Sequence, residues 1–308
     1  MNATQPSIGF IGLGIMGRPM AHNLLAAGYR LVVHDVTAAA VDELTAAGAT
    51  SAPTARDVAA ATDVLITMVP DSPDVEAVFL GPNGAFEALR PGWLAIDMSS
   101  IAPRTSRLLA ARAEAGGAVM LDAPVSGGDK GARAATLSIM VGGPADAFER
   151  ARPIFEALGK TIVHVGEAGA GQVVKACNQV VVALVIEAVA EGLLLGAKAG
   201  VAPDRIVEVL QGGLASTRVL EMRRDNMLGG HFEPGFRIRL HLKDLRNALD
   251  LARESGVVLP ITAEVDQMMQ ALQISGRGDL DHSGLLTLLE DLAHFRVADA
   301  RPAAPAAS

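Results

Sequence analysis

The sequence has few cysteines, few aromatic residues and few lysines, and these shortages exclude several classes of protein. The single cysteine, Cys177, excludes an intrachain disulfide and argues against a thiolate metal cluster, which fits a reducing compartment. Aromatic residues make up only 3% of the chain and the net charge is −8, so neither nucleic acid nor an anionic membrane is expected as a partner. The opening MNATQPS lacks the basic and apolar regions of a signal peptide. We therefore expect a globular cytoplasmic protein.

Lysine is scarce among the 26 basic residues, and each lysine therefore merits attention. Arginine stays charged, whereas the charge of a lysine responds readily to burial. Lys175 stands in GQVVKACNQ, directly before the apolar run VVVALVIEAVAEGLLLGAKAG. Because lysine is almost never fully buried without a partner, two interpretations are open. Lys175 either points to solvent or faces a cavity in which its proton has a function.

The first half of the chain alternates short apolar runs with helical stretches. Such alternation predicts a mostly parallel sheet with helices on both faces, a Rossmann-like doubly wound α/β domain over residues 1–167. The predicted strands are IGFI (8–11), LVVHD (31–35), VLITMV (64–69), LAIDM (94–98), AVMLDAPV (118–125), LSIMVGG (137–143) and TIVHVG (161–166).

Strand signals stop after this domain. Residues 168–199 predict one long interdomain helix that is apolar almost all round, as helices buried between domains or subunits are. Glu187 and Glu191 interrupt its apolar run, so we expect no membrane span. Residues 200–296 predict an all-α C-terminal domain, and residues 297–308 a disordered tail. A cleft between the two domains, with Lys175 at its edge, is the expected place for a site.

A glycine motif directly follows the first predicted strand. FIGLGIMGRPM contains Gly12-x-Gly14-x-x-Gly17, in which the glycines permit a tight turn, a close approach to a pyrophosphate and helix–strand packing. Asp35 ends the second predicted strand, where a carboxylate binds the ribose 2′-hydroxyl and repels a 2′-phosphate. The motif therefore predicts binding of NAD(H) in preference to NADP(H). The predicted cofactor contacts in this loop are Gly12, Leu13, Gly14, Ile15, Met16 and Gly17.

Two further loops follow strong strands, at the edge where doubly wound sheets bind ligands. MVPD places Met68, Val69 and Pro70 there, and DMSS places Ser99 there, with a hydroxyl suited to a carboxamide or a ribose. An ordinary helix cap is the alternative role for this serine.

A candidate substrate site combines a third loop with the long helix. Ser126, Gly127 and Gly128 can present consecutive backbone N–H groups to a carboxylate. Lys175 and Asn178 share one helix face and supply a proton donor and an orienting amide. Lys243 and Asp244 in FRIRLHLKDLRNALD could close over the cofactor, or form a surface ion pair with each other. Cys177 is expected to be buried, the histidines show no metal spacing, and His241 is too isolated to be a ligand.

Taken together, these blocks resemble the β-hydroxyacid dehydrogenase family. The resemblance rests on FIGLGIMGRPMAHN, DMSSIAP, LDAPVSGG, GAGQVVKACNQ and PGFRIRLHLKDLRNALD, which occur in the family's order across residues 7 to 296. It implies a Rossmann domain and a helical domain that mediates oligomerisation. The apolar surface of the long helix, too extensive for one small helical domain to cover, separately predicts a dimer or tetramer that meets through residues 180–199 and the C-terminal helices. The resemblance also implies that Lys175 is the catalytic acid/base, that Asn178 and the Ser126–Gly128 turn hold the substrate, and that Lys243 contacts the cofactor.

The resemblance further implies NADH-dependent reduction of tartronate semialdehyde (2-hydroxy-3-oxopropionate) to glycerate. DMSSIAP, GGLAS and FRIRLHLKDL are the blocks that favour this substrate. The alternatives within the family are a 3-hydroxyisobutyrate dehydrogenase and a threonate-type dehydrogenase. Outside it, a non-catalytic cofactor-binding scaffold or an imine-reducing relative remains, and the presence of Lys175 argues against both.

Overall fold

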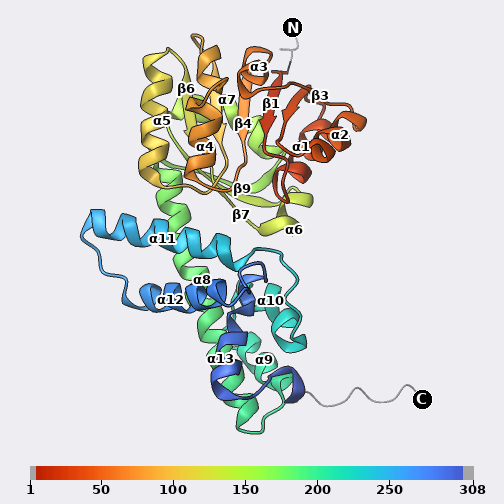
Figure 1. The fold of residues 1–308 in the computed structure, drawn as a ribbon, viewed down its shortest axis with the longest axis vertical. Helices are drawn as coiled ribbons and strands as arrows, with labels where there is room; N and C mark the ends of the chain where they lie inside the picture. The colour runs from red at the N-terminus through yellow and green to blue at the C-terminus, as the bar shows by residue number, and fades with distance from the viewer. Residues whose placement is uncertain (1–4, 301–308) are drawn as a thin grey trace. The chain divides into compact units, whose positions relative to one another are not determined.

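The computed structural model describes residues 5–300 and divides the chain into two compact units (Figure 1). One, the sheet unit, runs to Lys175, and the other, the helical unit, begins at Ala176. Residues 1–4 of the stretch considered for a signal peptide, and residues 301–308 of the predicted tail, lie outside the described residues.

The sheet unit contains one nine-stranded sheet in the order β3-β2-β1-β4-β5-β6-β8-β7, with β9 also paired to β8. Strands β1 to β6 pair in parallel, whereas β8 is antiparallel to β6 and β7. The strands are β1 (Ile8–Ile11), β2 (Leu31–His34), β3 (Thr50–Ser51), β4 (Val64–Thr67), β5 (Leu94–Asp97), β6 (Val119–Asp122), β7 (Val125–Ser126), β8 (Leu137–Gly142) and β9 (Gly159–Gly166).

Helices cover both faces of this sheet, as the apolar strands require. Successive strand residues belong to different cores: Phe10 packs on one face with α1 and α7, whereas Ile11 packs on the other with α3, α4 and α5. The helices of the unit are α1 (Gly17–Ala26), α2 (Ala38–Ala46), α3 (Ala55–Ala60), α4 (Ser72–Leu80), η1 (Ala85–Ala88), α5 (Pro103–Ala115), α6 (Gly128–Arg133) and α7 (Ala145–Glu156). The predicted doubly wound sheet is confirmed.

The sheet differs from the prediction in two places. The run 118–125 forms two strands rather than one, because Pro124 has no N–H to donate and separates β6 from β7. The two-residue strand β3 was not predicted, since its exposed Thr50 and Ser51 carry no apolar pattern.

The helical unit packs around the long helix α8 (Ala170–Lys198), whose first residues belong to the sheet unit. Ala183, Ile186 and Leu193 of α8 share a core with Leu245 of α11 and Met269 of α12. Prolines begin α9 and α12, where the missing N–H has no intrahelical partner in any case. The helices are α9 (Pro203–Gly212), α10 (Arg218–Gly229), α11 (Ile238–Ser255), α12 (Pro260–Ile274), η2 (His282–Leu285), α13 (Leu286–Ala293) and η3 (Ala298–Ala300).

Helix α8 is apolar on its exposed side as well. By length and composition alone it could cross a membrane, with an 18-residue window of mean hydropathy 2.2, although Glu187 and Glu191 lie within the helix. Its inner face nevertheless packs in the core of the helical unit, as core helices of this composition do. On the outer face Val181 and Leu195 are 60% and 74% exposed.

The prediction of a disordered tail from residue 297 is wrong for its first four residues. Val297 is buried in the core of the helical unit, and its N–H donates to Glu290 Oε1 at 2.8 Å. Ala298–Ala300 then form η3. The side chain of Val297 and the carboxylate of Glu290 therefore keep this segment ordered, although its composition is typical of a disordered tail.

Candidate active site

The glycine loop between β1 and α1 has the geometry that its motif predicts. Gly12 has a φ of +97°, and a side chain there would collide with the Met68 carbonyl. A side chain at Gly17 would collide with the Gly12 carbonyl, so α1 can pack closely on the loop only with glycine at this position. A side chain at Gly14 would have no neighbour within 4 Å of its Cβ, so there is room for a ligand against the Gly14 backbone.

The other loop residues have different environments. Leu13 is buried and Met16 packs against the core, whereas Ile15 is exposed. Asp35 at the end of β2 accepts hydrogen bonds from Leu13 N (2.6 Å) and Thr37 N (2.7 Å). The carboxylate therefore holds the glycine loop against the second strand, and each of its oxygens retains a lone pair for a ribose hydroxyl. This fits a dinucleotide, with the glycine loop at the pyrophosphate and Asp35 at the ribose.

The loop after β4 lies beside the glycine loop. The Met68 carbonyl and the Val69 side chain are the nearest neighbours of a built Gly12 Cβ, and Pro70 is exposed. Val69 N donates to Ser99 Oγ at 3.0 Å. Because Ser99 is fully buried, its hydroxyl holds the 68–70 loop in place, and any contribution to cofactor binding is through that loop.

A buried carboxylate lies beneath these loops. Asp97 ends β5, and its Oδ1 accepts from Thr67 Oγ1 (2.7 Å) and Ser99 N (3.2 Å). Within residues 5–300 its Oδ2 has no hydrogen-bond partner. Burial raises the pKa of Asp97 to about 6, partly offset by the hydrogen bonds from Ser99 and Thr67, and nearby Asp122 raises it further.

This shift predicts that Asp97 lowers stability at neutral and alkaline pH. The folded protein holds the proton more tightly than the unfolded chain, so stability falls as the pH rises from about 4 to about 6. Asp97→Asn should therefore raise the free energy of unfolding at pH 8 by up to about 3 kcal/mol, and much less at pH 4.5. Urea denaturation at both pH values measures this, with the exposed Asp42→Asn as control. A gain that is equal at both pH values would contradict the assignment.

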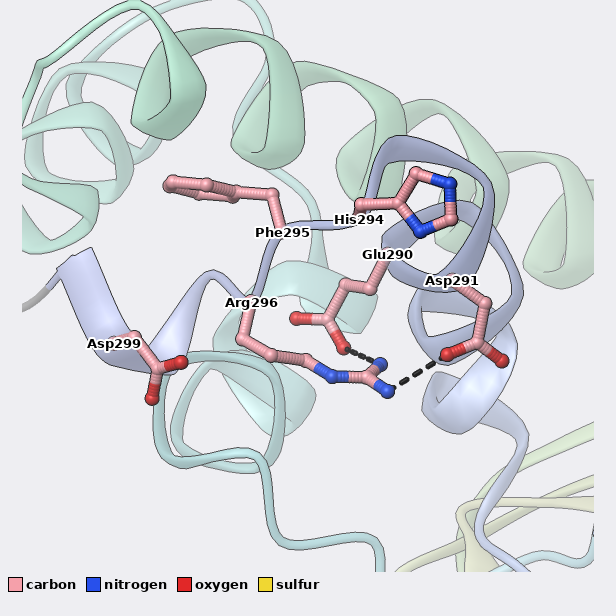
Figure 2. Close-up of a pocket in the computed structure, with 6 residues that line it drawn as sticks. All are labelled: Glu290, Asp291, His294, Phe295, Arg296 and Asp299. Atoms are coloured by element: carbon pink, nitrogen blue, oxygen red, sulfur yellow. Dashed lines mark hydrogen bonds and ion pairs between the residues drawn. The ribbon is translucent and has the colours of Figure 1, made fainter.

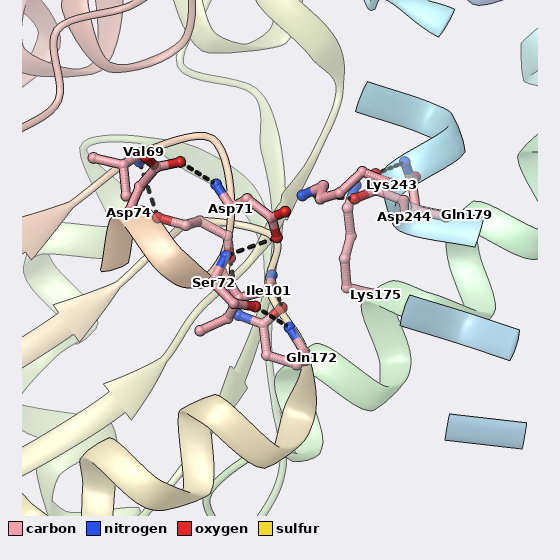
Figure 3. A network of polar contacts seen from close by, with 12 residues as sticks. Val69, Asp71, Ser72, Asp74, Ile101, Gln172, Lys175, Gln179, Lys243 and Asp244 are labelled. Atoms are coloured by element: carbon pink, nitrogen blue, oxygen red, sulfur yellow. Dashed lines mark hydrogen bonds and ion pairs between the residues drawn. The ribbon is translucent and has the colours of Figure 1, made fainter. Parts of the chain in front are cut away.

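Asp122 and Gln172 hold the first turn of α8 against the sheet. Asp122 Oδ1 accepts from Gly169 N (2.7 Å) and Oδ2 from Gln172 N (2.9 Å), which caps the helix. Burial raises the pKa of Asp122, and these backbone N–H groups partly counteract the rise. The Gln172 side chain donates to Ser99 O (2.8 Å) and accepts from Ile101 N (3.1 Å) (Figure 3). Nothing in the sequence pattern singled out Gln172.

Lys175 lies one turn further along α8 and is 8% exposed. Its Nζ donates to the Val125 carbonyl at 2.8 Å. The next residues are Ser126, Gly127 (φ +136°) and Gly128 (φ +62°), a turn that requires glycine at both positions. A Cβ at Gly128 would have no neighbour within 4 Å, so the space beside this residue is open. The sheet unit therefore brings Lys175 to the predicted substrate turn.

The remaining candidates lie in the helical unit, where Gln179, a residue that the sequence did not single out, connects Asn178 to Asp244 and Lys243. Asn178 Nδ2 donates to Gln179 Oε1 (2.8 Å), and Gln179 Nε2 donates to Asp244 Oδ2 (2.5 Å). Asp244 Oδ1 pairs with Lys243 Nζ at 2.9 Å. Asp244 is nearly buried, so this is not a surface ion pair. A role for Asn178 and Lys243 in one site with Lys175 stays a prediction.

Cys177 was expected to be buried, and this is wrong: its side chain is exposed. Helix α8 is apolar on nearly every side, so the sequence pattern did not show which side faces solvent.

Neither metal ligands nor the hollow on α13 adds to this site. Across residues 5–300 no three His, Cys, Asp or Glu side chains are grouped to hold a metal ion. A hollow on α13 and the turn after it is lined by Glu290, Asp291, His294, Phe295, Arg296 and Asp299 (Figure 2). Arg296 is already paired there with Glu290 and Asp291.

The glycine loop, Asp35 and the parallel strands define a dinucleotide-binding α/β enzyme of the Rossmann class. Comparison with known proteins specifies the family. A family model for the NAD binding domain of 6-phosphogluconate dehydrogenase matches residues 7–166. A second, for the NAD-binding of NADP-dependent 3-hydroxyisobutyrate dehydrogenase, matches residues 169–289.

Individual relatives agree with these matches over nearly the whole chain. The 2-hydroxy-3-oxopropionate reductase of Escherichia coli (strain K12) is 48% identical over 94% of this chain and 99% of its own. The NAD-dependent L-serine dehydrogenase of Pseudomonas aeruginosa is 40% identical, over 92% of this chain and 97% of its own. The structure of Mycobacterium tuberculosis 3-hydroxyisobutyrate dehydrogenase with L-serine has a TM-score of 0.84 and 35% identity, covering 93% of this chain and 99% of that one. The chain belongs to the β-hydroxyacid dehydrogenase family, and it is an NAD(P)-dependent oxidoreductase.

Proposed function

We propose that the protein reduces tartronate semialdehyde (2-hydroxy-3-oxopropionate) to glycerate with NADH, and that Lys175 is the general acid/base. The observation that carries the proposal is the hydrogen bond from Lys175 Nζ to the Val125 carbonyl at 2.8 Å. It holds a nearly buried ammonium group next to the Ser126–Gly128 turn. The 48% identity to a 2-hydroxy-3-oxopropionate reductase supports this substrate.

The chemistry needs one hydride and one proton. A bound nicotinamide supplies the hydride in the reductive direction and accepts it in the oxidative direction. As the carbonyl carbon receives the hydride, its oxygen becomes an alkoxide, and Lys175 gives it the proton from Nζ. In the oxidative direction the neutral amine takes the hydroxyl proton back. The Val125 carbonyl orients Nζ throughout, and Asp122 with Gln172 fixes the helix turn that carries the lysine.

Other residues bind and orient the reactants. The turn at Ser126, Gly127 and Gly128 offers backbone N–H groups to the substrate carboxylate. Asn178 orients the substrate and Lys243 contacts the cofactor, each held by the Gln179–Asp244 hydrogen bond. Asp35 favours NADH, because its carboxylate binds a ribose hydroxyl and repels a phosphate.

Substrate preference tests the proposal directly. We expect kcat/KM for tartronate semialdehyde to exceed that for methylmalonate semialdehyde by roughly tenfold or more, because a site that binds a substrate hydroxyl leaves polar groups unpaired when it is missing. NADH oxidation by the purified protein measures both. Reversed preference would indicate a 3-hydroxyisobutyrate dehydrogenase, and no turnover of any short semialdehyde acid would overturn the proposed substrate class.

We also propose that the protein assembles as a dimer or tetramer through residues 180–199, most of which belong to α8, and the C-terminal helices. The exposed Val181 and Leu195 support this, because side chains of this kind gain from being covered. Light scattering at micromolar concentration should give a multiple of 31.8 kDa. Leu195→Asp should weaken the assembly while leaving the circular dichroism of the chain unchanged. A single 31.8 kDa species for the unaltered protein would contradict the proposal.

A further inference from the structure

Two buried histidines of the helical unit have no part in the proposed reaction. His241 lies on α11 and His282 begins η2, and their Nδ1 atoms are 3.1 Å apart. Both side chains are almost completely buried. In the sequence His241 is isolated, because its partner follows 41 residues later.

Their neighbours determine where the protons lie. Arg223 Nε of α10 donates to His282 Nε2 at 3.0 Å, so that nitrogen carries no proton. The neutral His282 ring is then protonated on Nδ1 and donates to His241 Nδ1. His241 in turn is protonated on Nε2 and donates to the Gln179 carbonyl of α8 at 3.1 Å. Each ring accepts one hydrogen bond in this chain and donates one.

An additional proton would break the chain. On His282 Nε2 it would face the Arg223 N–H, and on His241 Nδ1 it would face the His282 N–H. Asp281 also lies beside the pair, 4.0 Å from His282 Nε2 and 3.5 Å from Arg223 Nε. Asp281 already accepts from Gly235 N and Phe236 N, and the Phe236 ring lies edge-on to both imidazoles. The arrangement therefore requires both rings to be neutral.

The chain ends at the residue that joins Asn178 to Lys243. The Gln179 carbonyl accepts from His241, and the Gln179 side chain accepts from Asn178 Nδ2. The same side chain donates to Asp244, which pairs with Lys243 (Figure 3). His241 and Asp244 lie one turn apart on α11. Both therefore bind Gln179 of α8: His241 binds its backbone carbonyl, and Asp244 binds its side chain.

We propose that His241 and His282 are positioning residues: as a neutral, hydrogen-bonded pair they fix Gln179 against α11, and proton uptake by either ring releases it. This inference rests on the proposed function for the roles of Asn178 and Lys243. Loss of the pair should weaken binding of substrate and cofactor, because it disturbs the residues that hold them. It should affect kcat little, because Lys175 is held by other contacts.

The first test does not depend on the reaction. NMR of the full-length protein with 15N-labelled histidine reports the tautomer and protonation of each ring. We expect His282 protonated on Nδ1 and His241 on Nε2, and both should stay neutral at pH 6, below the ordinary histidine value of about 6.5. A charged ring at pH 6, or the opposite tautomers, would overturn the inference.

The second test separates positioning from folding. His282→Gln keeps a hydrogen-bond acceptor for Arg223 and a donor for His241 but cannot titrate. His282→Phe keeps neither the acceptor nor the donor. Between pH 8 and pH 5, a range that extends well below the ordinary histidine value of about 6.5, KM of the unaltered protein should rise roughly tenfold, which corresponds to one lost hydrogen bond. His282→Gln should reduce that rise, because one of the two titrating rings is gone, and His282→Phe should raise KM at both pH values with kcat largely retained.

His231→Gln, which replaces an exposed histidine, is the control and should follow the unaltered protein. The inference fails if His282→Gln keeps the full pH dependence of KM, and this variant decides the question alone if His282→Phe does not fold. If the protein turns over no semialdehyde, the proposed function fails, and the NMR result still decides the state of the histidine pair.

Discussion

Replacing Lys175 by alanine or by arginine is expected to lower kcat by two or more orders of magnitude, within the range of roughly 10²–10⁴-fold for general acid catalysis. Alanine removes the proton donor. Arginine keeps the positive charge but cannot release its proton near neutral pH. Because NADH is proposed to bind mainly at the glycine loop and Asp35, its dissociation constant should change little in either variant.

Steady-state kinetics and NADH fluorescence titration on the same preparations measure both effects. Lys130→Arg is the matched control, since Lys130 is an exposed lysine two residues after the Ser126–Gly128 turn. It should retain nearly full kcat. If Lys175→Arg also did so, Lys175 would act as an electrostatic anchor for the substrate carboxylate, and the proton would come from another group.

Asp35→Ser combined with Val36→Arg should shift the cofactor preference towards NADPH by roughly 100-fold, as expected when repulsion of a phosphate is removed and a charge-assisted hydrogen bond is added. Val36 is 98% exposed, so arginine there displaces nothing. Asp35 also holds Leu13 N and Thr37 N, and Asp35→Ser alone should therefore weaken binding of both cofactors.

The ratio of kcat/KM for NADPH to that for NADH measures the shift. Val36→Gln, which adds a polar side chain without charge, is the control and should leave the ratio near that of the unaltered protein. An unaltered protein that used NADPH as well as NADH, or better, would contradict the role given to Asp35.

Local patterns in the sequence predicted the parts of the site that short segments build. The glycine loop, Asp35 and the turn at Ser126–Gly128 each depend on a few consecutive residues and on the strand before them. The geometry of the glycine loop and of the Ser126–Gly128 turn follows from backbone conformations that glycine alone adopts readily. The strands of the sheet were predictable for the same reason, because each apolar run is bounded by turn residues.

The residues that hold the catalytic groups were not predictable in this way. Gln172 binds Ser99 across 73 residues, and Gln179 binds Asp244 across 65. Neither glutamine belongs to a local pattern, so only the folded chain shows its partner. The exposure of Cys177 was mispredicted for a related reason: the hydrophobic pattern of α8 gives it no preferred buried face.

Chemical rescue of Lys175→Ala is the most direct test of whether Lys175 supplies the proton. The truncated side chain leaves a cavity beside the Val125 carbonyl into which a small amine can bind. We expect methylammonium to restore NADH-dependent reduction of tartronate semialdehyde in proportion to its concentration, whereas guanidinium, which carries the charge but cannot give up a proton near neutral pH, should not. Equal rescue by both cations, or by neither, would contradict a proton-donor role for Lys175.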